Sequence, residues 1–393
     1  MARSKLNSRL DGPNDAPASK LRTQQRQPIL KLIQKLQPVS RAELARQSGL
    51  RPTLVSEVVD DLKHARWVSE SGSVARPRGR RPTMLTLNER MGVLVADVHP
   101  RRAIVALIDL PGRLLARRVI PLPSEPGRAI QSIADCMAAI RSEHPGVTPE
   151  GVGVSLPGRI DPRTQHLMFA PNLRWGNFDI RAEFEARTGL TVELENDANG
   201  CLLSEIWFGR MDGVKDAVLI AIAEGIGTAL LINGQLVRGK SGMAGEFGHI
   251  QLDPGGPICA CGQRGCWEML GSSSAALRYY AVASEDAVTS MEALLHLAQE
   301  GSEDAIQALT RQAEAIGRGL RLLAAALSPE LILVTGEITS LWSIFGPIVE
   351  AHMSANMLAD VLPRLVPSTD AESARLRGAA AALLQRLAQQ WSS

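Results

Sequence analysis

Residues 246–268 read EFGHIQLDPGGPICACGQRGCWE, which places three of the chain's five cysteines within eight positions and a histidine ten residues upstream of the first. These residues are His249, Cys259, Cys261 and Cys266. Three thiolates and one imidazole form a closed four-coordinate zinc site, whereas a catalytic zinc keeps one position open. Gly262 and Gly265 allow the backbone to turn tightly around an ion. We therefore predict one structural Zn²⁺ per chain. Unconnected thiols are disfavoured by this spacing, and nothing indicates the oxidising compartment that a disulfide needs.

Length and composition narrow the class of protein. A chain of 393 residues with 45% hydrophobic residues predicts about two to three domains with ample material for buried cores. No apolar run approaches the ~20 residues of a membrane-spanning helix, and the first residues, MARSKL, lack the apolar segment of a signal peptide. We expect a cytoplasmic protein with no membrane partner, in which the isolated Cys136 and Cys201 are small buried hydrophobic residues.

The net charge of +2 conceals an asymmetry along the chain. Residues 1–90 contain 18 Lys and Arg against 8 Asp and Glu, whereas residues 91–393 contain 25 against 33. A basic module joined to an acidic body favours a nucleic-acid partner for the module. A basic surface that is merely solvated is the alternative, so charge alone does not decide.

The basic module carries the pattern of a winged helix-turn-helix domain over residues 19–88, after a polar segment at 1–18 that we expect to be a disordered tail. Apolar residues at helical spacing predict a first helix over 29–36. Residues 40–43, SRAE, are a capping box that opens a second helix, and Gly49 ends that helix.

A third helix and a basic wing complete the module. Pro52 suits a first helical turn, and the valines after it recur at helical spacing. Residues 67–70 and 84–87 predict two short strands, and the loop at 76–82 between them predicts the wing. In this arrangement the third helix enters the major groove, and the wing arginines reach the minor groove or the DNA backbone. The predicted contacts to double-stranded DNA are Arg51, Thr53, Ser56, Arg78, Arg80 and Arg81. A protein-docking helical domain and a flexible basic linker are the alternatives.

From residue 91 onward the pattern changes to alternating strands and helices. Apolar runs predict strands at 93–97, 103–109, 151–155, 217–222 and 331–336, and alanine-rich stretches predict helices at 274–299, 303–327 and 371–390. Because this order occurs twice, we expect two α/β lobes with a cleft between them. The N-terminal lobe would span 89–200 and be completed by 371–393. The C-terminal lobe would span 201–370 and carry the zinc loop at 246–268.

Several motifs together resemble one known family. They are SRAELA at 40–45, GRRP at 79–82, PNLRW at 171–175, NDAN at 196–199, GEFGH at 245–249 and the cysteine cluster. From about residue 20 to about residue 385 the chain resembles the ROK family (repressors, open reading frames and sugar kinases). The resemblance is to its repressors with a fused winged helix, which respond to N-acetylglucosamine, xylose or glucose. It implies a multi-domain protein with a two-lobed, actin-like fold of the hexokinase type, zinc on the four residues above, and a sugar in the cleft.

The same resemblance assigns the sugar contacts residue by residue. They are Asn172, Asn196, Asp197, Glu246, His249 and Glu268, with His249 lying against the sugar from its zinc-bound position. The chemistry agrees independently, because sugar hydroxyls need strong acceptors, which carboxylates and amides supply. Asp197 holds the position of the general base in the family's kinases. The alternative is that these are ordinary turn and cap residues, since Asn-Asp pairs favour turns.

Two segments depart from the pattern of the family's kinases. Their phosphate-binding Asp-x-Gly-Gly-Thr is here DVHPR at 97–101, and Pro100 has no N–H to offer a phosphate. Their second phosphate loop is here AEGIGTA at 223–229, where Glu224 would repel a phosphate. A base without a nucleotide site has no phosphoryl donor. We therefore expect a kinase fold retained as a sensor, not an enzyme.

These patterns predict a sugar-responsive regulator of transcription, most simply a repressor of carbohydrate genes. One alternative is an active sugar kinase that carries a DNA-binding module. The other is a DNA-binding protein whose body only oligomerises or docks another protein. Because a single winged helix needs symmetry to read two half-sites, we expect a homodimer or a dimer of dimers on the operator.

Overall fold

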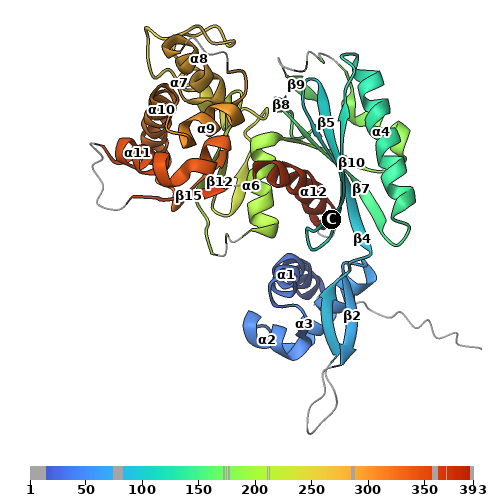
Figure 1. Ribbon diagram of the computed structural model, residues 1–393. Helices are drawn as coiled ribbons and strands as arrows, with labels where there is room; N and C mark the ends of the chain where they lie inside the picture. Colours follow the sequence, from blue (N-terminus) through green and yellow to red (C-terminus); the bar gives the residue numbers. More distant parts are fainter. Residues whose placement is uncertain are drawn as a thin grey trace, which may run out of the picture.

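The computed structural model describes residues 15–73, 83–170, 173, 175, 178–209, 211, 213–284, 288–355, 362–368 and 370–389. A small N-terminal domain lies below two α/β lobes in the view of Figure 1. In this described part of the chain, no helix is long and apolar enough to cross a membrane.

The N-terminal domain has the three helices and the hairpin of a winged helix-turn-helix. Its elements are α1 (Asp15–Leu36), β1 (Val39–Ser40), α2 (Arg41–Ser48), α3 (Pro52–His64), β2 (Val68–Ser73) and β3 (Thr83–Leu87), with the strands in the order β1-β3-β2. The Ser40 side chain accepts the amide of Glu43 at 3.2 Å, and Gly49 ends α2 with a φ of 69°, as predicted. The carboxylate of Glu43 accepts from Arg46 instead of returning to Ser40, so the expected capping box is only half formed.

Helix α1 corrects the expected start of this domain. It begins at Asp15, inside the segment 1–18 that we expected to be a disordered tail. The added turns lack apolar periodicity, which is why the pattern missed them. Arg22 and Arg26 of α1 both pair with Asp61 of α3, so tertiary ion pairs support this part of the helix. Residues 1–14 lie outside the described residues.

The two lobes contain five-stranded sheets of the same topology. In lobe I the strand order is β10-β7-β4-β5-β6, and in lobe II it is β13-β12-β11-β14-β15. The lobe I strands are β4 (Met91–Val98), β5 (Arg102–Asp109), β6 (Leu114–Pro121), β7 (Thr148–Leu156) and β10 (Val192–Asn196). The lobe II strands are β11 (Ala217–Ile222), β12 (Ile226–Ile232), β13 (Gln235–Val237), β14 (Leu331–Gly336) and β15 (Arg364–Ser368). In each sheet three consecutive strands form an antiparallel meander, and two later strands extend it in parallel. The five predicted strands and the two predicted α/β lobes are confirmed.

Helices bury both faces of the lobe I sheet. Helices α4 (Pro126–Glu143) and α5 (Ile180–Thr188) pack on one face, and α12 (Ala371–Gln389) packs on the other. Lobe II has its core among α8 (Ser273–Ala283), α9 (Met291–Gln299), α10 (Glu303–Leu327) and α11 (Trp342–Ser354). The stretch 274–299, expected as one helix, is two helices, because Ser290 caps a new helix by accepting the amide of Ala293.

Helix α6 (Asp197–Phe208) lies between the lobes beside α12 (Figure 1). It packs on β11 and β12 of lobe II and crosses α12 at two glycines. A Cβ on Gly378 would come within 2.0 Å of the carbonyl oxygen of Gly200, so only glycine permits this crossing. The lobe boundary expected at residue 200 therefore falls inside a continuous helix that packs on both lobes.

Candidate ligand cleft and metal site

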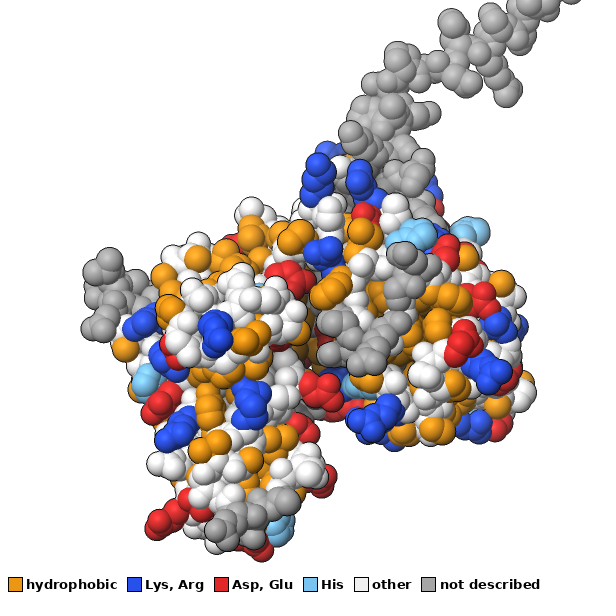
Figure 2. Space-filling model, turned by 90° about the horizontal axis from the view of Figure 1, so that it is seen from above, with side chains coloured by type: hydrophobic (Ala, Val, Ile, Leu, Met, Phe, Trp, Pro, Cys, Tyr) orange, Lys and Arg blue, Asp and Glu red, His pale blue; other side chains and the backbone are white. Residues whose placement is uncertain are grey.

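A cavity of about 690 Å³ lies between the two lobes. Seen from above, a notch with acidic side chains separates the lobes (Figure 2). Lobe I lines the cavity with the end of β10, the start of α6 and a small hairpin of β8 (Arg159–Ile160) and β9 (Leu167–Phe169). Lobe II lines it with the β11–β12 turn and the loop before the cysteines. Of the predicted sugar contacts, those that line the cavity are Asn196, Asp197, Glu246, His249 and Glu268, whereas Asn172 lies outside the described residues.

The side chain of Asn196 holds the start of α6. Its Oδ1 accepts the amides of Ala198 at 3.0 Å and Asn199 at 3.1 Å. Its Nδ2 donates to the carbonyl of Gly158 at 2.9 Å and to the carboxylate of Asp197 at 3.0 Å. A side-chain amide has only two N–H donors, so both are in use. Asn196 therefore has the capping role that we kept as an alternative, and it positions Asp197. A side-chain cap of this kind stabilises a helix by about 1 kcal/mol.

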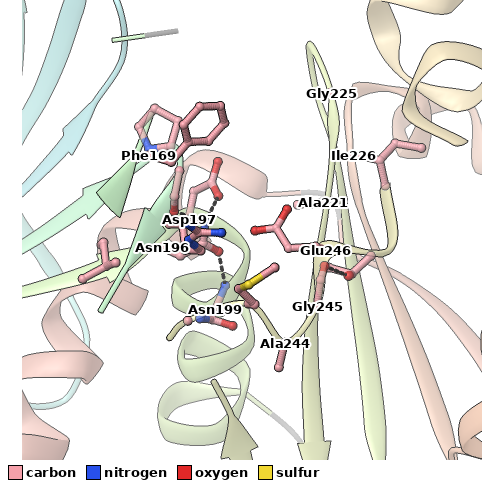
Figure 3. Close-up of a pocket in the computed structure, with 18 of the residues that line it drawn as sticks. Phe169, Asn196, Asp197, Asn199, Ala221, Gly225, Ile226, Ala244, Gly245 and Glu246 are labelled. Atoms are coloured by element: carbon pink, nitrogen blue, oxygen red, sulfur yellow. Dashed lines mark hydrogen bonds between the residues drawn. The ribbon is translucent and has the colours of Figure 1, made fainter. Parts of the chain in front are cut away.

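Asp197 faces the cavity from the first turn of α6. Figure 3 shows it on one side of the cavity, with Glu246 on a loop of the other lobe. Burial raises the pKa of the Asp197 carboxyl, and this outweighs the amide hydrogen bond from Ala198 and the charge of Arg375, which both favour ionisation. Such a carboxyl is a strong acceptor once ionised, and it is held ready for a hydroxyl donor.

An ion-paired network holds the end of β4 and the turn that follows it. The Oδ2 atom of Asp97 lies 3.0 Å from Nε2 of His99 and accepts from Nε of Arg375 at 2.8 Å. Asp97 is buried, which opposes its ionisation, but the hydrogen bond from His99 and the charge of Arg375 outweigh burial and lower its pKa. Arg375 belongs to α12, 278 positions away, and sequence reasoning missed it because no local pattern marks such a partner.

A second ion pair, with a buried carboxylate, joins the two lobes. Glu195 of β10 is 4% exposed and accepts from Nε of Arg238 at 3.0 Å. Arg238 directly follows β13 of lobe II. The other carboxylate oxygen of Glu195 accepts from Asn199 at 3.0 Å, which ties the pair to α6. Sequence reasoning missed this pair as well, because the strand VELEN at 192–196 carries two glutamates and does not show which of them meets a distant arginine.

The four predicted zinc ligands come together in space. The ligand atoms of His249, Cys259, Cys261 and Cys266 all lie within 4.8 Å of one another. Nδ1 of His249 is 3.4 Å from Sγ of Cys259, and the Sγ atoms of Cys261 and Cys266 are 3.6 Å apart. Two thiolates on a tetrahedral zinc, each about 2.3 Å from the ion, lie about 3.8 Å apart. The cluster thus has the size and donor set to bind a metal ion.

Glycines and a tryptophan hold this loop in shape. Gly262 and Gly265 have φ values of 92° and 61°, as the predicted tight turns require. The indole N–H of Trp267 donates to the carbonyl of Ala315 on α10 at 2.9 Å. A Cβ on Gly319 would lie 2.0 Å from the Trp267 ring, so this glycine makes room for it. The loop is therefore built onto the core of lobe II as well as around the cluster.

Two carboxylates connect the cluster to the cleft. One is Glu268 of α7 (Trp267–Gly271), whose Oε1 lies 2.9 Å from Sγ of Cys259. Its Oε2 abuts the β11–β12 turn, where a Cβ on Gly225 would come within 2.8 Å. The other is Glu246, whose Oε2 lies 3.8 Å from Nε2 of His249. His249 thus turns Nδ1 towards the cysteines and Nε2 towards the second carboxylate.

The expected second phosphate loop is only partly a loop. Residues 226–229 belong to β12, and the turn is confined to 223–225. Glu224 is exposed in this turn and is not among the residues that line the cavity, whereas its neighbours Ala223 and Gly225 are. Pro100 lies in the β4–β5 turn and is exposed.

Comparison with known proteins identifies the family. Residues 97–386 match the ROK family. The chain belongs to this family. It is similar to the xylose repressor of Bacillus subtilis, with 31% identity over 315 residues, 79% of this chain and 81% of that protein. These findings and the repeated sheets confirm the predicted two-lobed, actin-like fold.

Two solved structures are similar over different extents. One is a ROK family transcriptional regulator described as a homologue of the E. coli MLC protein, with 24% identity and a TM-score of 0.79, covering 95% of this chain and 99% of that chain. The other is a ROK family glucokinase from Streptomyces griseus in complex with glucose and AMPPNP. That glucokinase has 27% identity and a TM-score of 0.65, and the match covers 76% of this chain and 99% of that chain.

The predicted DNA-contacting residues of this ROK chain fall into two groups. Arg51 and Thr53 are exposed at the start of α3, and Ser56 follows one turn later, half-buried. The backbone carbonyl of Ser56 accepts from Arg41 at 3.0 Å, which fixes α3 against α2. The predicted wing residues that lie outside the described residues are Arg78, Arg80 and Arg81.

The N-terminal domain of the ROK chain contacts lobe I through an aromatic pair. The rings of Trp67, just after α3, and Trp207, near the end of α6, have centroids 6.4 Å apart at 40°. Both side chains are buried, and such a pair contributes about 0.5–1.5 kcal/mol beyond the area it buries. Arg66 also pairs with Glu150 of β7 at 3.3 Å. Helix α6 thus starts in the cleft at Asp197 and ends against the N-terminal domain.

Proposed function

We propose that this ROK chain is a sugar-responsive, DNA-binding repressor of transcription that acts as a homodimer or a dimer of dimers. A monosaccharide or sugar derivative binds in the inter-lobe cleft and changes the affinity of the N-terminal domain for its operator. The observation that carries the proposal is the course of α6, from Asp197 in the cleft to Trp207 against Trp67. The similarity to a xylose repressor over 79% of the chain supports it.

The sugar is bound by groups from both lobes. Asp197 of lobe I and Glu246 and Glu268 of lobe II accept hydrogen bonds from sugar hydroxyls. His249 offers Nε2 from the same side as Glu246, and Asn172 is a further proposed contact. Because the contacts come from two lobes, the ligand favours an arrangement in which the lobes are closed around it.

The cluster of one histidine and three cysteines holds a structural Zn²⁺ in this proposal. When bound, the ion supplies four strong bonds that fix the loop and no open position for chemistry. The residues of the loop do the rest. Trp267 anchors it in lobe II, and Glu246 and Glu268 point from it into the cleft. A ligand site needs such preorganised donors and acceptors.

We propose that this chain does not transfer a phosphoryl group. The carboxylate of Asp97 is already engaged by His99 and Arg375. Pro100 in the same turn cannot donate a backbone N–H to a phosphate. Glu224 is not among the residues that line the cavity. Asp197 therefore serves as an acceptor for the sugar and not as a catalytic base.

The switch needs only a modest difference in affinity. Sugar binding moves the lobes, α6 moves with them, and Trp207 shifts the docked N-terminal domains out of operator register. A coupling free energy of ~1–3 kcal/mol changes DNA affinity about 5- to 150-fold. The rotation of paired domains by even a small angle displaces recognition helices that must reach two half-sites.

One experiment separates this function from its alternatives. DNA fragments selected from random sequence by the protein are titrated by fluorescence anisotropy, with xylose, glucose or N-acetylglucosamine and their phosphates, while ATP turnover is followed in parallel. We expect one of these ligands to change DNA affinity at least about 5-fold, without ATP turnover. Sugar-dependent ATP turnover that Asp197→Ala abolishes would instead establish a kinase. DNA binding that no sugar changes would favour a body that only oligomerises or docks a protein.

A further inference from the structure

Among the described residues, three arginines line the cleft, and two of them are neutralised by buried carboxylates. Arg238 pairs with Glu195, and Arg375 pairs with Asp97. The third, Arg159 of β8, has no hydrogen bond or ion pair with any residue in the described part of the chain, and its Nε atom is buried without an acceptor. Leaving a buried N–H of a charged group without an acceptor destabilises a folded protein. Because Arg159 lines the cavity without a protein partner in the part of the chain that the structure describes, its guanidinium is placed to bind an acceptor that a ligand brings.

The surroundings of Arg159 hold its side chain beside the cavity. Arg159 pairs with Phe169 in the β8–β9 hairpin, so the two side chains share one face of the hairpin. From lobe II, Gly242 approaches with a φ of 67°, and a Cβ there would lie 2.2 Å from the carbonyl oxygen of Ile160. The same Cβ would lie 3.4 Å from Cγ of Arg159, so the backbone of Gly242 packs close to the arginine stem.

Phe169 adds an apolar surface next to the guanidinium. It is 57% exposed and lines the cavity, and it lies on the same side as Asn196 and Asp197 (Figure 3). Ligand sites combine apolar walls with a few polar groups that fix orientation. An aromatic face and a free guanidinium side by side suit a sugar ring that carries an anionic substituent, because guanidinium binds phosphate and carboxylate through two parallel hydrogen bonds.

The distribution of charge in the cleft supports the same kind of ligand. Asp197, Glu246 and Glu268 are acceptors for hydroxyl groups and would repel an anionic group placed against them. A ligand with hydroxyls at one end and an anionic group at the other satisfies these carboxylates and Arg159 together. On the basis of the proposed function, we infer that the ligand of the cleft is an anionic sugar, a phosphate ester or a sugar acid, whose anionic group binds Arg159.

The test compares neutral sugars with their anionic forms. Calorimetric titrations use xylose, glucose and N-acetylglucosamine, the corresponding 5- or 6-phosphates, and glucuronate and xylonate. The proteins are the wild type, Arg159→Gln and the control Arg163→Gln, which removes an exposed arginine from the neighbouring turn that does not line the cavity. Unchanged circular dichroism and DNA affinity of the apo protein verify that each variant is folded.

We expect one anionic form to bind the wild type and Arg163→Gln about 10-fold or more tightly than its neutral parent, the effect of one charge-assisted contact. In Arg159→Gln this preference falls to about 1, while the affinity for the neutral parent changes less than about 3-fold. A preference for the phosphate or for the carboxylate identifies the source of the anionic group.

Three results overturn the inference. The wild type binds neutral parents at least as tightly as anionic forms, or the anionic preference survives Arg159→Gln. Alternatively, Arg159→Gln weakens neutral and anionic sugars equally, which makes Arg159 a partner of a protein carboxylate in the closed state. If no sugar binds at all, the proposed function fails, and inorganic phosphate becomes the probe. Stabilisation by phosphate that Arg159→Gln removes and Arg163→Gln retains keeps the anion site, whereas equal stabilisation of all three proteins removes it.

Discussion

The two lobes share one sheet topology but build their sides of the cleft in different ways. In lobe II the cleft residues sit on a loop of 23 residues, 246–268, which carries the cysteine cluster and both carboxylates. In lobe I they are held by partners that are far apart in sequence, such as Asp97 and Arg375. Lobe I is also the lobe whose β7 pairs with Arg66 of the N-terminal domain. The difference shows that two lobes of the same topology position their cleft residues by different means, so function must be argued from the residues of each site.

The largest effect should come from removing a metal ligand from the loop of lobe II. Cys261→Ala removes one of four metal ligands, and we expect zinc to fall from about one per chain to near zero. The loop that carries Glu246 and Glu268 then loses its support, so sugar affinity is lost, whereas DNA binding of the apo protein remains. Metal analysis, calorimetry and DNA anisotropy measure the three quantities.

The matched control is Cys136→Ala, which removes a cysteine of lobe I that is remote from the cluster. It should leave the zinc content and the sugar response unchanged. Wild-type protein prepared without chelators that contains no zinc, or a full zinc content in Cys261→Ala, would contradict the proposed metal site.

The next effect contrasts two aspartates of lobe I. Burial raises the pKa of Asp197, so the folded protein favours the protonated form of this carboxyl. The stability that results is present below the unfolded-state pKa and is lost as pH rises through the folded-state pKa. Asp197→Asn should therefore raise the melting temperature near neutral pH while abolishing the sugar response, and the gain should shrink on acidification.

Asp97→Asn should do the opposite. Although burial opposes the charge of Asp97, His99 and Arg375 lower its pKa, so this carboxylate adds stability above its unfolded-state pKa that is lost as pH falls through the folded-state pKa. The variant should melt at a lower temperature near neutral pH and approach the wild type in acid. Melting curves across this pH range that shift in the same direction for both variants would contradict the assigned environments.

A smaller effect should follow from weakening the contact between α6 and the N-terminal domain. Trp207→Leu removes the aromatic pair with Trp67, and we expect the sugar-dependent change in DNA affinity to shrink about 2- to 10-fold, in line with the ~0.5–1.5 kcal/mol of such pairs. Sugar affinity itself should stay within about 3-fold. Trp342→Leu on α11 of lobe II is the control and should preserve the coupling. Equal loss in both variants would mean that α6 is not the connection.

The smallest effects concern the proposed DNA-contacting residues of the N-terminal domain. Arg80→Ala and Arg81→Ala should each reduce the steepness of log affinity against log salt by about 0.9. The reason is that fewer counterions leave the DNA on binding when one phosphate contact is lost. Thr53→Ala should change sequence preference instead and leave the slope intact. If the arginine variants keep both the affinity and the slope of the wild type, the wing loop is only a linker.

Local patterns were sufficient where neighbours in sequence are neighbours in space. The spacing of one histidine and three cysteines predicted a cluster that comes together within 4.8 Å. Apolar runs predicted the central strands β4, β5 and β7 of lobe I, and Ser40 and Gly49 marked the two ends of α2. In each case the signal and the structure it predicts lie within a few turns or one strand of chain.

The roles of individual cleft residues depended on chain segments that meet only in the folded protein. The sequence left open whether Asn196 binds a sugar or caps a helix, and its Oδ1 accepts the amides of Ala198 and Asn199 at the start of α6, which favours the cap. The sequence also did not show that Ala223 and Gly225 line the cavity whereas Glu224 between them does not. Whether an arginine is neutralised or free is likewise invisible in sequence, since Arg375 finds its carboxylate 278 positions away and Arg159 finds none among the described residues. A charge acts over a few ångströms of space irrespective of its distance along the chain, so only the folded arrangement decides which charges a ligand meets.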